Sequence, residues 1–230
     1  LRRGVVCLFH SETQGKPADR RACREEPVQG VNSRKTPKWR QQRWSPDDER
    51  LAPIASLKHA STLIEDYPAT GTLQQQFKAQ ILEMCNFHPR LLDRDCMPGH
   101  LTASALVVNE DRSRVMLHHH AKLNRWLQFG GHCDGDANLP AVSLRESIEE
   151  SGVPDLSIDP EIIDIDIHTI PQRKKVPEHL HLDIRFMVMA SDHSQPMKSD
   201  ESLEVCWYDV SELNKIVLDQ SVMRLVRIIC

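Results

Sequence analysis

Hydrophobic residues in the first half of the chain recur at helical spacing, which predicts two helices before any strand. Ser45 is followed by proline at the first helical position and by acids in the first turn, a pattern typical of a helix start, so we expect a helix to about residue 66. Tyr67-Pro68 then interrupts the chain, and a second helix is expected from Thr72 to Phe87. Its apolar positions lie four residues apart, at Leu73, Phe77, Ile81 and Cys85.

Short apolar runs separated by polar turns follow Pro98-Gly99 and predict β-strands. The first two runs flank the polar turn at Asn109–Arg112 and are expected to form a hairpin. Pro140 and Gly152 delimit a helix, because proline suits the first turn and glycine the left-handed position after the last. These features predict an α/β layered domain, a mixed sheet with helices on its faces. The expected strands are 102–109, 115–119, 126–129, 162–170, 180–189 and 205–208, and the expected later helices are 140–151, 211–217 and 221–229.

Residues 1–46 show no sustained period and differ in charge from the rest of the chain. They carry 11 Lys and Arg against 4 Asp and Glu, whereas the whole chain has a net charge of -4. Scattered cations with few aromatic residues favour a solvated, disordered tail over a contact with nucleic acid or lipid. We therefore expect a basic disordered tail (1–46), a helical segment that packs on the domain (47–98) and the main α/β domain (99–230).

Cysteine usage and hydropathy limit the classes of protein to which this chain can belong. The 7 cysteines form an odd number without a Cys-x-x-Cys pair, which argues against a disulfide framework and a four-thiolate zinc site. No apolar run approaches the ~18 residues needed to span a bilayer, and Val5–Phe9 is too short for a signal-peptide core. We therefore expect a soluble, cytoplasmic protein with reduced thiols and no membrane partner.

Three glutamates in the helix expected at 140–151 form the candidate site for chemistry. Glu146, Glu149 and Glu150 stand at i, i+3 and i+4, so they share one face of the helix. Like charges at this spacing repel one another unless a cation lies among them, and Mg²⁺ prefers such oxygen ligands. Arg145 can reach Glu149 one turn later and orient its carboxylate. Taken alone, a charged run of this kind is more often the solvated face of an amphipathic helix.

The spacing of the whole stretch resembles the Nudix box, the loop-helix-loop metal site of Nudix hydrolases. That box has Gly, five residues, Glu, seven residues and then Arg-Glu-apolar-x-Glu-Glu-x-Gly-apolar, and with Gly131 first the second half falls in register from Arg145 to Val153. The resemblance covers roughly residues 99–210 and implies an αβα sandwich that hydrolyses a nucleoside diphosphate linked to another moiety. It also implies Mg²⁺ or Mn²⁺ as cofactor, with Arg145 in the catalytic set and, as metal ligands, Glu146, Glu149, Glu150 and the Gly131 carbonyl.

Two positions depart from the Nudix box. Ala137 stands where the family has Glu, which affects how the metal-binding loop is braced, and Asp134 or Asp136 is the candidate to compensate. Ser147 stands where the family has an apolar residue, and a small side chain there can still pack against the sheet. Neither departure removes a metal ligand.

Histidines around the box extend the resemblance to a bacterial Nudix subgroup whose box opens with Gly-Gly-His. His179 and His181 alternate on an expected strand, so they point to the same face. They are candidates to bind a substrate phosphate. Together with His132 or Cys133 they are also candidates for a second metal site. A structural role for the pair is the commoner case.

Two more residues have both a binding and a structural interpretation. Arg185 is a candidate phosphate contact and equally a candidate ion-pair partner for Asp183, two residues before it. Trp126 can stack on a nucleotide base, although aromatic residues at strand ends more often pack in a core or at its rim. We take Arg185, Trp126, His179 and His181 as the candidate substrate-binding set.

Three functions on this fold remain open from the sequence. The first is the hydrolase, in which Glu146, Glu201 or Glu204 removes a proton from water. The second is a non-hydrolytic module that binds a nucleotide or regulates a partner, kept open by Ala137 and the basic tail. The third is isomerisation of a prenyl diphosphate, ranked last because Cys133 follows a histidine instead of preceding a Gly-His pair. The fold also makes a homodimer a candidate assembly.

Overall fold

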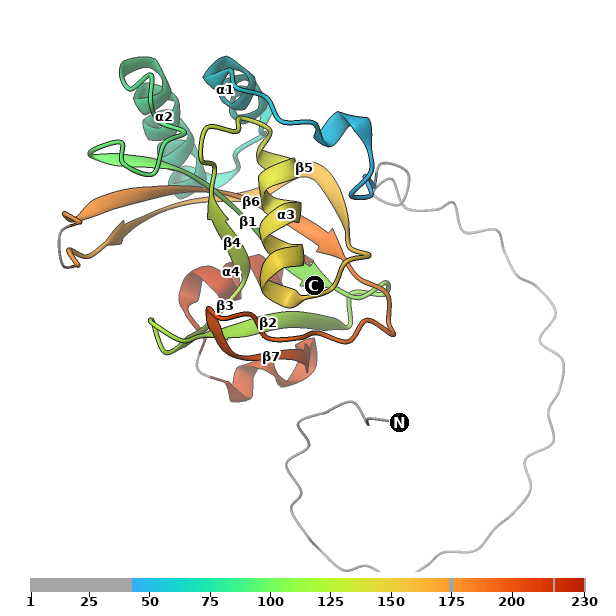
Figure 1. The fold of residues 1–230 in the computed structure, drawn as a ribbon. Coiled ribbons are helices and arrows are strands. Elements are labelled where there is room, and N and C mark those ends of the chain that lie inside the picture. The colour runs from blue at the N-terminus through green and yellow to red at the C-terminus, as the bar shows by residue number, and fades with distance from the viewer. Residues whose placement is uncertain (1–42, 174–175, 217, 230) are drawn as a thin grey trace, which may run out of the picture.

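The computed structural model describes residues 43–173, 176–216 and 218–229, and its helices pack against both faces of a sheet (Figure 1). Every expected strand is present, and the run expected at 126–129 is divided between two strands. The strands are β1 (Gly99–Val108), β2 (Arg114–His120), β3 (Arg125–Leu127), β4 (Phe129–His132), β5 (Ser157–Ile170), β6 (His179–Met189) and β7 (Ser202–Asp209). The helices are α1 (Leu57–Asp66), α2 (Gly71–Phe87), α3 (Leu139–Ser151) and α4 (Gln220–Ile229), with 3₁₀ helices η2 (Glu49–Leu51) and η3 (Val210–Lys215).

The sheet is mixed, and β1 is its branching strand. The order is β3-β2-β1-β6-β5, with β4 also paired to β1 and β7 to β2. β1 and β6 run parallel, from Gly99 opposite Leu180 to Val108 opposite Met189, while β1 pairs antiparallel with β2 and β4. The end of β1 forms the expected hairpin with β2, and its middle, Thr102 to Ala105, pairs with β4. This branching brings β4, which carries the start of the Nudix box, beside the middle of β1.

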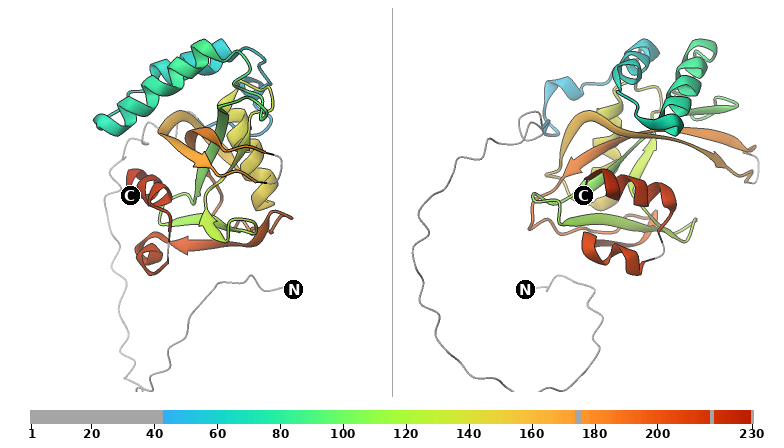
Figure 2. Two further views of the ribbon diagram at one scale, coloured as in Figure 1. Left: turned by 90° about the vertical axis from the view of Figure 1, so that its left-hand side faces the viewer. Right: turned by 180° about the vertical axis from the view of Figure 1, so that it is seen from behind.

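The two faces of the central strands have different partners, because side chains alternate along a strand. Ala103 of β1 and Ile184 of β6 belong to a core shared with α1, α2 and α3. Leu106 and Met187 point the other way, into a core shared with η3 and α4. Figure 2 shows the sheet between α3 on one side and α4 on the other. The expected αβα sandwich is therefore the fold of this chain.

The N-terminal helical segment differs from the prediction at its start. The expected single helix before residue 66 is wrong, because the short η2 is followed by a break and α1 begins only at Leu57. Pro53 explains the break, since proline has no N–H to donate and disfavours a helical conformation in the residue before it. The second helix is confirmed as α2, and its Gln74 side chain hydrogen-bonds both backbone groups of Ile165 at 2.8 and 3.1 Å. These bonds attach the segment to β5.

Packing on the domain begins before the expected boundary at residue 46. Trp44 and Ile158 of β5 form a β-bridge with two backbone hydrogen bonds of 3.0 Å. Arg43 also forms an ion pair with Glu110 at 2.8 Å. The remainder of the expected tail, residues 1–42, lies outside the described residues. Within the described ranges, no helix has both the length and the apolar character needed to cross a bilayer.

Candidate functional site

The candidate site is carried by α3, whose ends follow from its local sequence. Pro140 occupies the first turn, and Gly152 ends the helix with φ of 67°, a left-handed conformation that glycine adopts without strain. A side chain at position 152 would also approach Met197 to 2.9 Å. The helix expected at 140–151 is therefore confirmed, and with it the common face of the three glutamates.

Glu146 lies directly against the backbone of Gly131. A Cβ atom at position 131 would collide with the Glu146 carboxylate, so only glycine permits this approach. The side chain of Glu146 is 19% exposed, and burial raises the pKa of its carboxyl group. The fold thus brings together two residues that the Nudix box places fifteen positions apart.

Glu150 is the most deeply buried of the three glutamates. Its Oε2 accepts a hydrogen bond of 3.0 Å from the backbone N–H of Gly130, and the residue is only 8% exposed. Burial raises the pKa of this carboxyl group to about 8, and the negative charges of Glu146, Glu201 and Glu149 act in the same direction. The carboxylate form of Glu150 therefore lacks a compensating positive charge.

Arg145 is the cation nearest to these acids in the box. Its guanidinium donates to Glu146 Oε1 at 3.0 Å and to the His132 carbonyl at 3.2 Å. The expected contact with Glu149 is longer, 4.0 Å, and the Glu149 side chain is 62% exposed. Arg145 therefore orients Glu146 more than Glu149, and Glu149 is free to turn toward a ligand.

The loop before α3 is braced where the box has lost its first glutamate. Ala137 is fully buried, and its N–H donates to the Ile54 carbonyl at 2.6 Å. The side chain of Asp136 accepts hydrogen bonds of 2.9 Å from the N–H groups of Ile54 and Asn138. Asn138 donates in turn to the carbonyls of Arg50 and Ala52. The segment around η2 thus holds the loop.

The remaining part of this loop is held by an ion pair. Arg94, which sequence reasoning did not single out, forms a bidentate contact with Asp134. Asp134 and Asp136, the two residues expected to compensate for Ala137, therefore both have partners outside the box. Ser147, the second departure, is buried and donates to the Ser143 carbonyl at 2.8 Å, so the helix itself satisfies its hydroxyl group.

Comparison with known proteins agrees with this geometry. The model of the NUDIX domain family matches residues 98–226, more than half of the chain. This chain belongs to the NUDIX domain family. By class it is a Nudix hydrolase. A comparison with curated proteins found no match.

Solved structures of Nudix proteins are similar to this chain at low identity. An Ap4A hydrolase from C. elegans is 15% identical, with a TM-score of 0.44, over 56% of this chain and 93% of its own. The dihydroneopterin triphosphate pyrophosphohydrolase of E. coli is 16% identical, with a TM-score of 0.44, over 55% of this chain and 92% of its own. A NUDIX-family hydrolase from Clostridium perfringens is 19% identical, with a TM-score of 0.38, over 56% and 95%.

The donor set of the Nudix helix fits a hard divalent cation. Glu146 and Glu150 both have a raised pKa because they are buried and lie near other carboxylates, a situation that a cation among them would relieve. Carboxylate and carbonyl oxygens are the ligands that Mg²⁺ and Mn²⁺ prefer. Glu146, Glu149, Glu150 and the Gly131 carbonyl are thus suitable ligands for such an ion.

Arg185 is placed as an ion-pair partner within the sheet. It is fully buried and contacts Asp183 at 2.7 Å, Asp166 at 3.1 Å and Asp164 at 3.2 Å. It also donates to the Ser221 hydroxyl group at 3.1 Å. Of its two interpretations, the contact with Asp183 is the one present here, and no surface of Arg185 is open to a phosphate.

Trp126 is placed in the rim of the second core. Its ring stacks on His119 with centroids 5.0 Å apart and meets Tyr208 edge-on at 5.1 Å. It also forms a bridge with Leu218 beyond η3. These contacts match the packing role rather than the stacking of a base.

Histidines from four strands gather on one face of the sheet, and they include His168 of β5, whose ring lies 5.4 Å from that of His181. The ring of His100 on β1 lies 4.8 Å from His181, 5.0 Å from His179 and 5.1 Å from His132, measured between centroids. The expectation that His132 lies near the other pair is correct, whereas His100 was missed because the expected strand began at Thr102. Alternation from His100 to Thr102 is the signal that would have found it.

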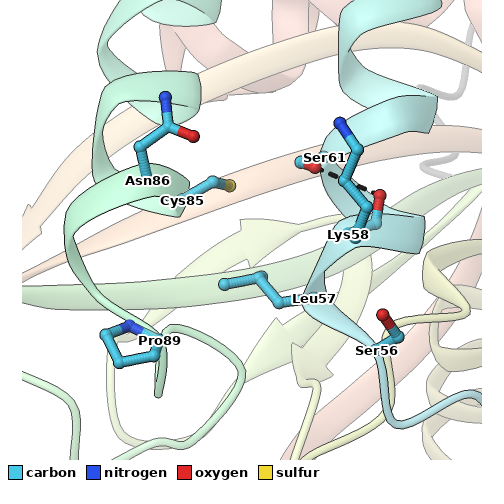
Figure 3. Close-up of a pocket in the computed structure, with 7 residues that line it drawn as sticks. All are labelled: Ser56, Leu57, Lys58, Ser61, Cys85, Asn86 and Pro89. Atoms are coloured by element: carbon cyan, nitrogen blue, oxygen red, sulfur yellow. Dashed lines mark hydrogen bonds between the residues drawn. The ribbon is translucent and has the colours of Figure 1, made fainter.

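A surface pocket outside the Nudix site lies between α1 and α2 (Figure 3). It is lined by Ser56, Leu57, Lys58, Ser61, Cys85, Asn86 and Pro89. Burial raises the pKa of the Cys85 thiol to about 11, so this cysteine is protonated and a poor nucleophile at neutral pH. Cys133, considered from the sequence, is also buried, and burial again raises its pKa.

Proposed function

We propose that this Nudix domain is a metal-dependent hydrolase that cleaves the diphosphate linkage of a nucleoside diphosphate joined to another moiety. The observation that supports this proposal is the placement of Glu146 and Glu150 against the backbone of β4, with Glu149 on the same face of α3. Mg²⁺ or Mn²⁺ is the proposed cofactor. When bound, the ion neutralises diphosphate oxygens and promotes deprotonation of water.

The residues of the chain itself orient the glutamates for this role. The Gly130 N–H holds Glu150, and the Arg145 guanidinium holds Glu146, so two of three carboxylates are positioned before any ligand binds. Preorganised groups lose less conformational freedom on binding. We propose Arg145 as a positioning residue for this reason.

The proton of the attacking water requires a carboxylate acceptor. Glu146 is one candidate, and Glu201 is another because its charge is close enough to raise the pKa of Glu150. Glu204 is the weaker candidate, since its carboxylate accepts a hydrogen bond from the Cys206 thiol at 3.1 Å. His179 and His181 remain candidates for the substrate side of the site.

The test is turnover of a compound panel with Mg²⁺ or Mn²⁺, comparing the wild-type chain with Glu150→Gln. The panel holds ADP-ribose, NADH, dinucleoside polyphosphates including Ap4A, nucleotide sugars, coenzyme A, nucleoside triphosphates and dihydroneopterin triphosphate. We expect Glu150→Gln to lower kcat by about 100-fold or more, since it removes a carboxylate that acts in the transition state. The matched control is Glu83→Gln, an exposed glutamate of α2, which should retain full activity.

A second function is favoured if no compound of the panel is hydrolysed. Nucleotide binding without turnover, in a well-folded wild-type chain supplied with either metal, would contradict the hydrolase and support the non-hydrolytic module. Ala137 is the observation that favours this alternative, because the box glutamate is absent there. The bacterial subgroup, a cytoplasmic location and a homodimer remain predictions from the sequence.

A further inference from the structure

Three histidines from separate strands place their ring nitrogens within reach of one ion. His100 of β1, His132 of β4 and His181 of β6 have ligand atoms that all lie within 4.8 Å of one another. Among the described residues this is the one group of three or more such side chains that is so close. The sheet register produces it, because His100 is paired directly with His181 and His132 with Thr102, the next residue on the same face of β1.

Three of the six ring nitrogens in this cluster lack a hydrogen-bond partner within the described part of the chain. Both nitrogens of His100 and Nε2 of His181 are buried without a hydrogen bond. The Cys96 carbonyl lies near enough to favour a protonated His100 ring, but not in the geometry of a hydrogen bond. Buried polar atoms normally have a partner, and leaving one unsatisfied costs about 1–3 kcal/mol. Three such atoms in one cluster point to a ligand that the protein chain does not itself supply.

We propose that His100, His132 and His181 form a binding site for a transition-metal ion of the zinc class, separate from the glutamate site of the Nudix helix. Imidazole nitrogen is a ligand that Zn²⁺, Co²⁺ and Ni²⁺ bind well, whereas Mg²⁺ prefers oxygen. Tetrahedral coordination at Zn–N distances of about 2.1 Å places ligand nitrogens about 3.4 Å apart, so modest side-chain rotation closes the site. The inference does not depend on the proposed hydrolase activity.

A fourth histidine stands beside the site, with one ring nitrogen bonded to the backbone. The Nδ1 of His179 lies 2.9 Å from the Pro177 carbonyl, and because a carbonyl only accepts, this nitrogen carries the proton. The lone pair of Nε2 is then available to a metal. A hydrogen bond of this kind from one nitrogen is what orients histidine ligands in metal sites. The fourth coordination position belongs to His179 or to water.

The two sites lie on opposite sides of β4. Position 131 faces the Glu146 carboxylate on α3, and His132 points the other way because side chains alternate along a strand. Three ring nitrogens of the cluster are buried without a hydrogen bond, and an imidazole nitrogen binds a metal ion through such a free lone pair. The geometry therefore favours a cation.

The test uses Co²⁺ as a spectroscopic probe on the full chain, stripped with a chelator and titrated in excess Mg²⁺. We expect one equivalent of Co²⁺ to bind with visible d–d absorption, both in the wild-type chain and in Glu150→Gln. His132→Asn and His181→Gln should each remove this absorption. The matched control is His193→Asn, an exposed histidine of the loop after β6, which should retain it. Circular dichroism verifies that each variant is folded.

Several outcomes would overturn the proposal. One is no stoichiometric Co²⁺ binding by the wild-type chain in excess Mg²⁺. Another is binding that Glu150→Gln abolishes while folded His132→Asn retains it, because the ion would then occupy the glutamate site. A strong near-ultraviolet charge-transfer band would assign the ion to thiolates instead. Binding of inorganic phosphate to the metal-free chain, lost in His181→Gln, would assign the cluster to an anion.

Discussion

At the scale of single residues, Glu150 shows how burial can prepare a carboxylate for a cation. Its carboxylate accepts a hydrogen bond from the Gly130 N–H, and among the described residues no arginine or lysine forms an ion pair with it. The nearby charged residues that affect its pKa are Glu146, Glu201 and Glu149, and all three are negative. Ionising this carboxyl group therefore costs free energy in the metal-free chain, whereas a bound divalent ion would stabilise the charged form.

This arrangement predicts a pH-dependent stability of the metal-free chain. The pKa of Glu150 rises from 4.5 to about 8 on folding, so between these values the folded state holds a proton that the unfolded state has lost. The free energy of unfolding should therefore fall as pH rises from about 5 to about 8.5, by a few kcal/mol at most. Glu150→Gln should flatten this dependence, as measured by urea unfolding in chelator. Parallel pH profiles for the two proteins would contradict the assignment.

At the scale of elements, the segment around η2 takes part in the Nudix site although it lies outside the box. Ile54, Ala52 and Arg50 all hydrogen-bond to the loop that precedes α3. Ala137 is fully buried beneath them. The small side chain at this position is thus what allows the N-terminal segment to lie on the loop.

This contact predicts that restoring the family residue will damage the fold. Ala137→Glu introduces a buried, unpaired carboxylate and excess volume, so we expect the free energy of unfolding to fall by about 3 kcal/mol or more. Ala79→Glu, at an exposed position of α2, is the control and should change it by less than about 1 kcal/mol. Urea denaturation of both variants measures the difference. An Ala137→Glu chain as stable as wild type would show that the segment does not cover this position.

At the scale of the whole molecule, a buried ion network connects the sheet to α4. Arg185 of β6 contacts Asp164 and Asp166 of β5, and Arg224 of α4 contacts the same two acids at 2.7 Å. The acidic charges of β5 thus attract cations from two elements. Each buried charge of this network has a partner of opposite charge, which offsets part of the free-energy cost of removing it from water.

Removing Arg185 should therefore destabilise the molecule as a whole. We expect Arg185→Met to lower the free energy of unfolding by about 3–5 kcal/mol, because Asp183 would remain buried without its cationic partner. Arg125→Met, which breaks an exposed pair with Asp219, should cost less than about 1 kcal/mol. Equilibrium unfolding in urea tests both. If Arg185 were instead a substrate contact, Arg185→Met would raise KM and leave stability unchanged.

Most helices and strands could be predicted from the sequence, whereas contacts between residues far apart in the chain could not. Strands and the helix α3 were predicted because apolar alternation and the Pro140 to Gly152 limits are local signals. The helix expected before residue 66 was wrong because Pro53 was not weighed against the helix start at Ser45. His100 was missed because the expected strand began at Thr102, three residues after the start of β1 at Gly99.

Residue spacing was enough to predict the register of the Nudix box and the common face of Glu146, Glu149 and Glu150. Both depend only on spacing along one helix, which the backbone geometry converts directly into position. Three other features became visible only in the folded chain: η2 braces the box loop, Arg185 is buried among aspartates, and His100 joins His132 and His181. These contacts depend on how β1, β4, β5 and β6 pair, because strand register, unlike helical spacing, is set by partners far away along the chain.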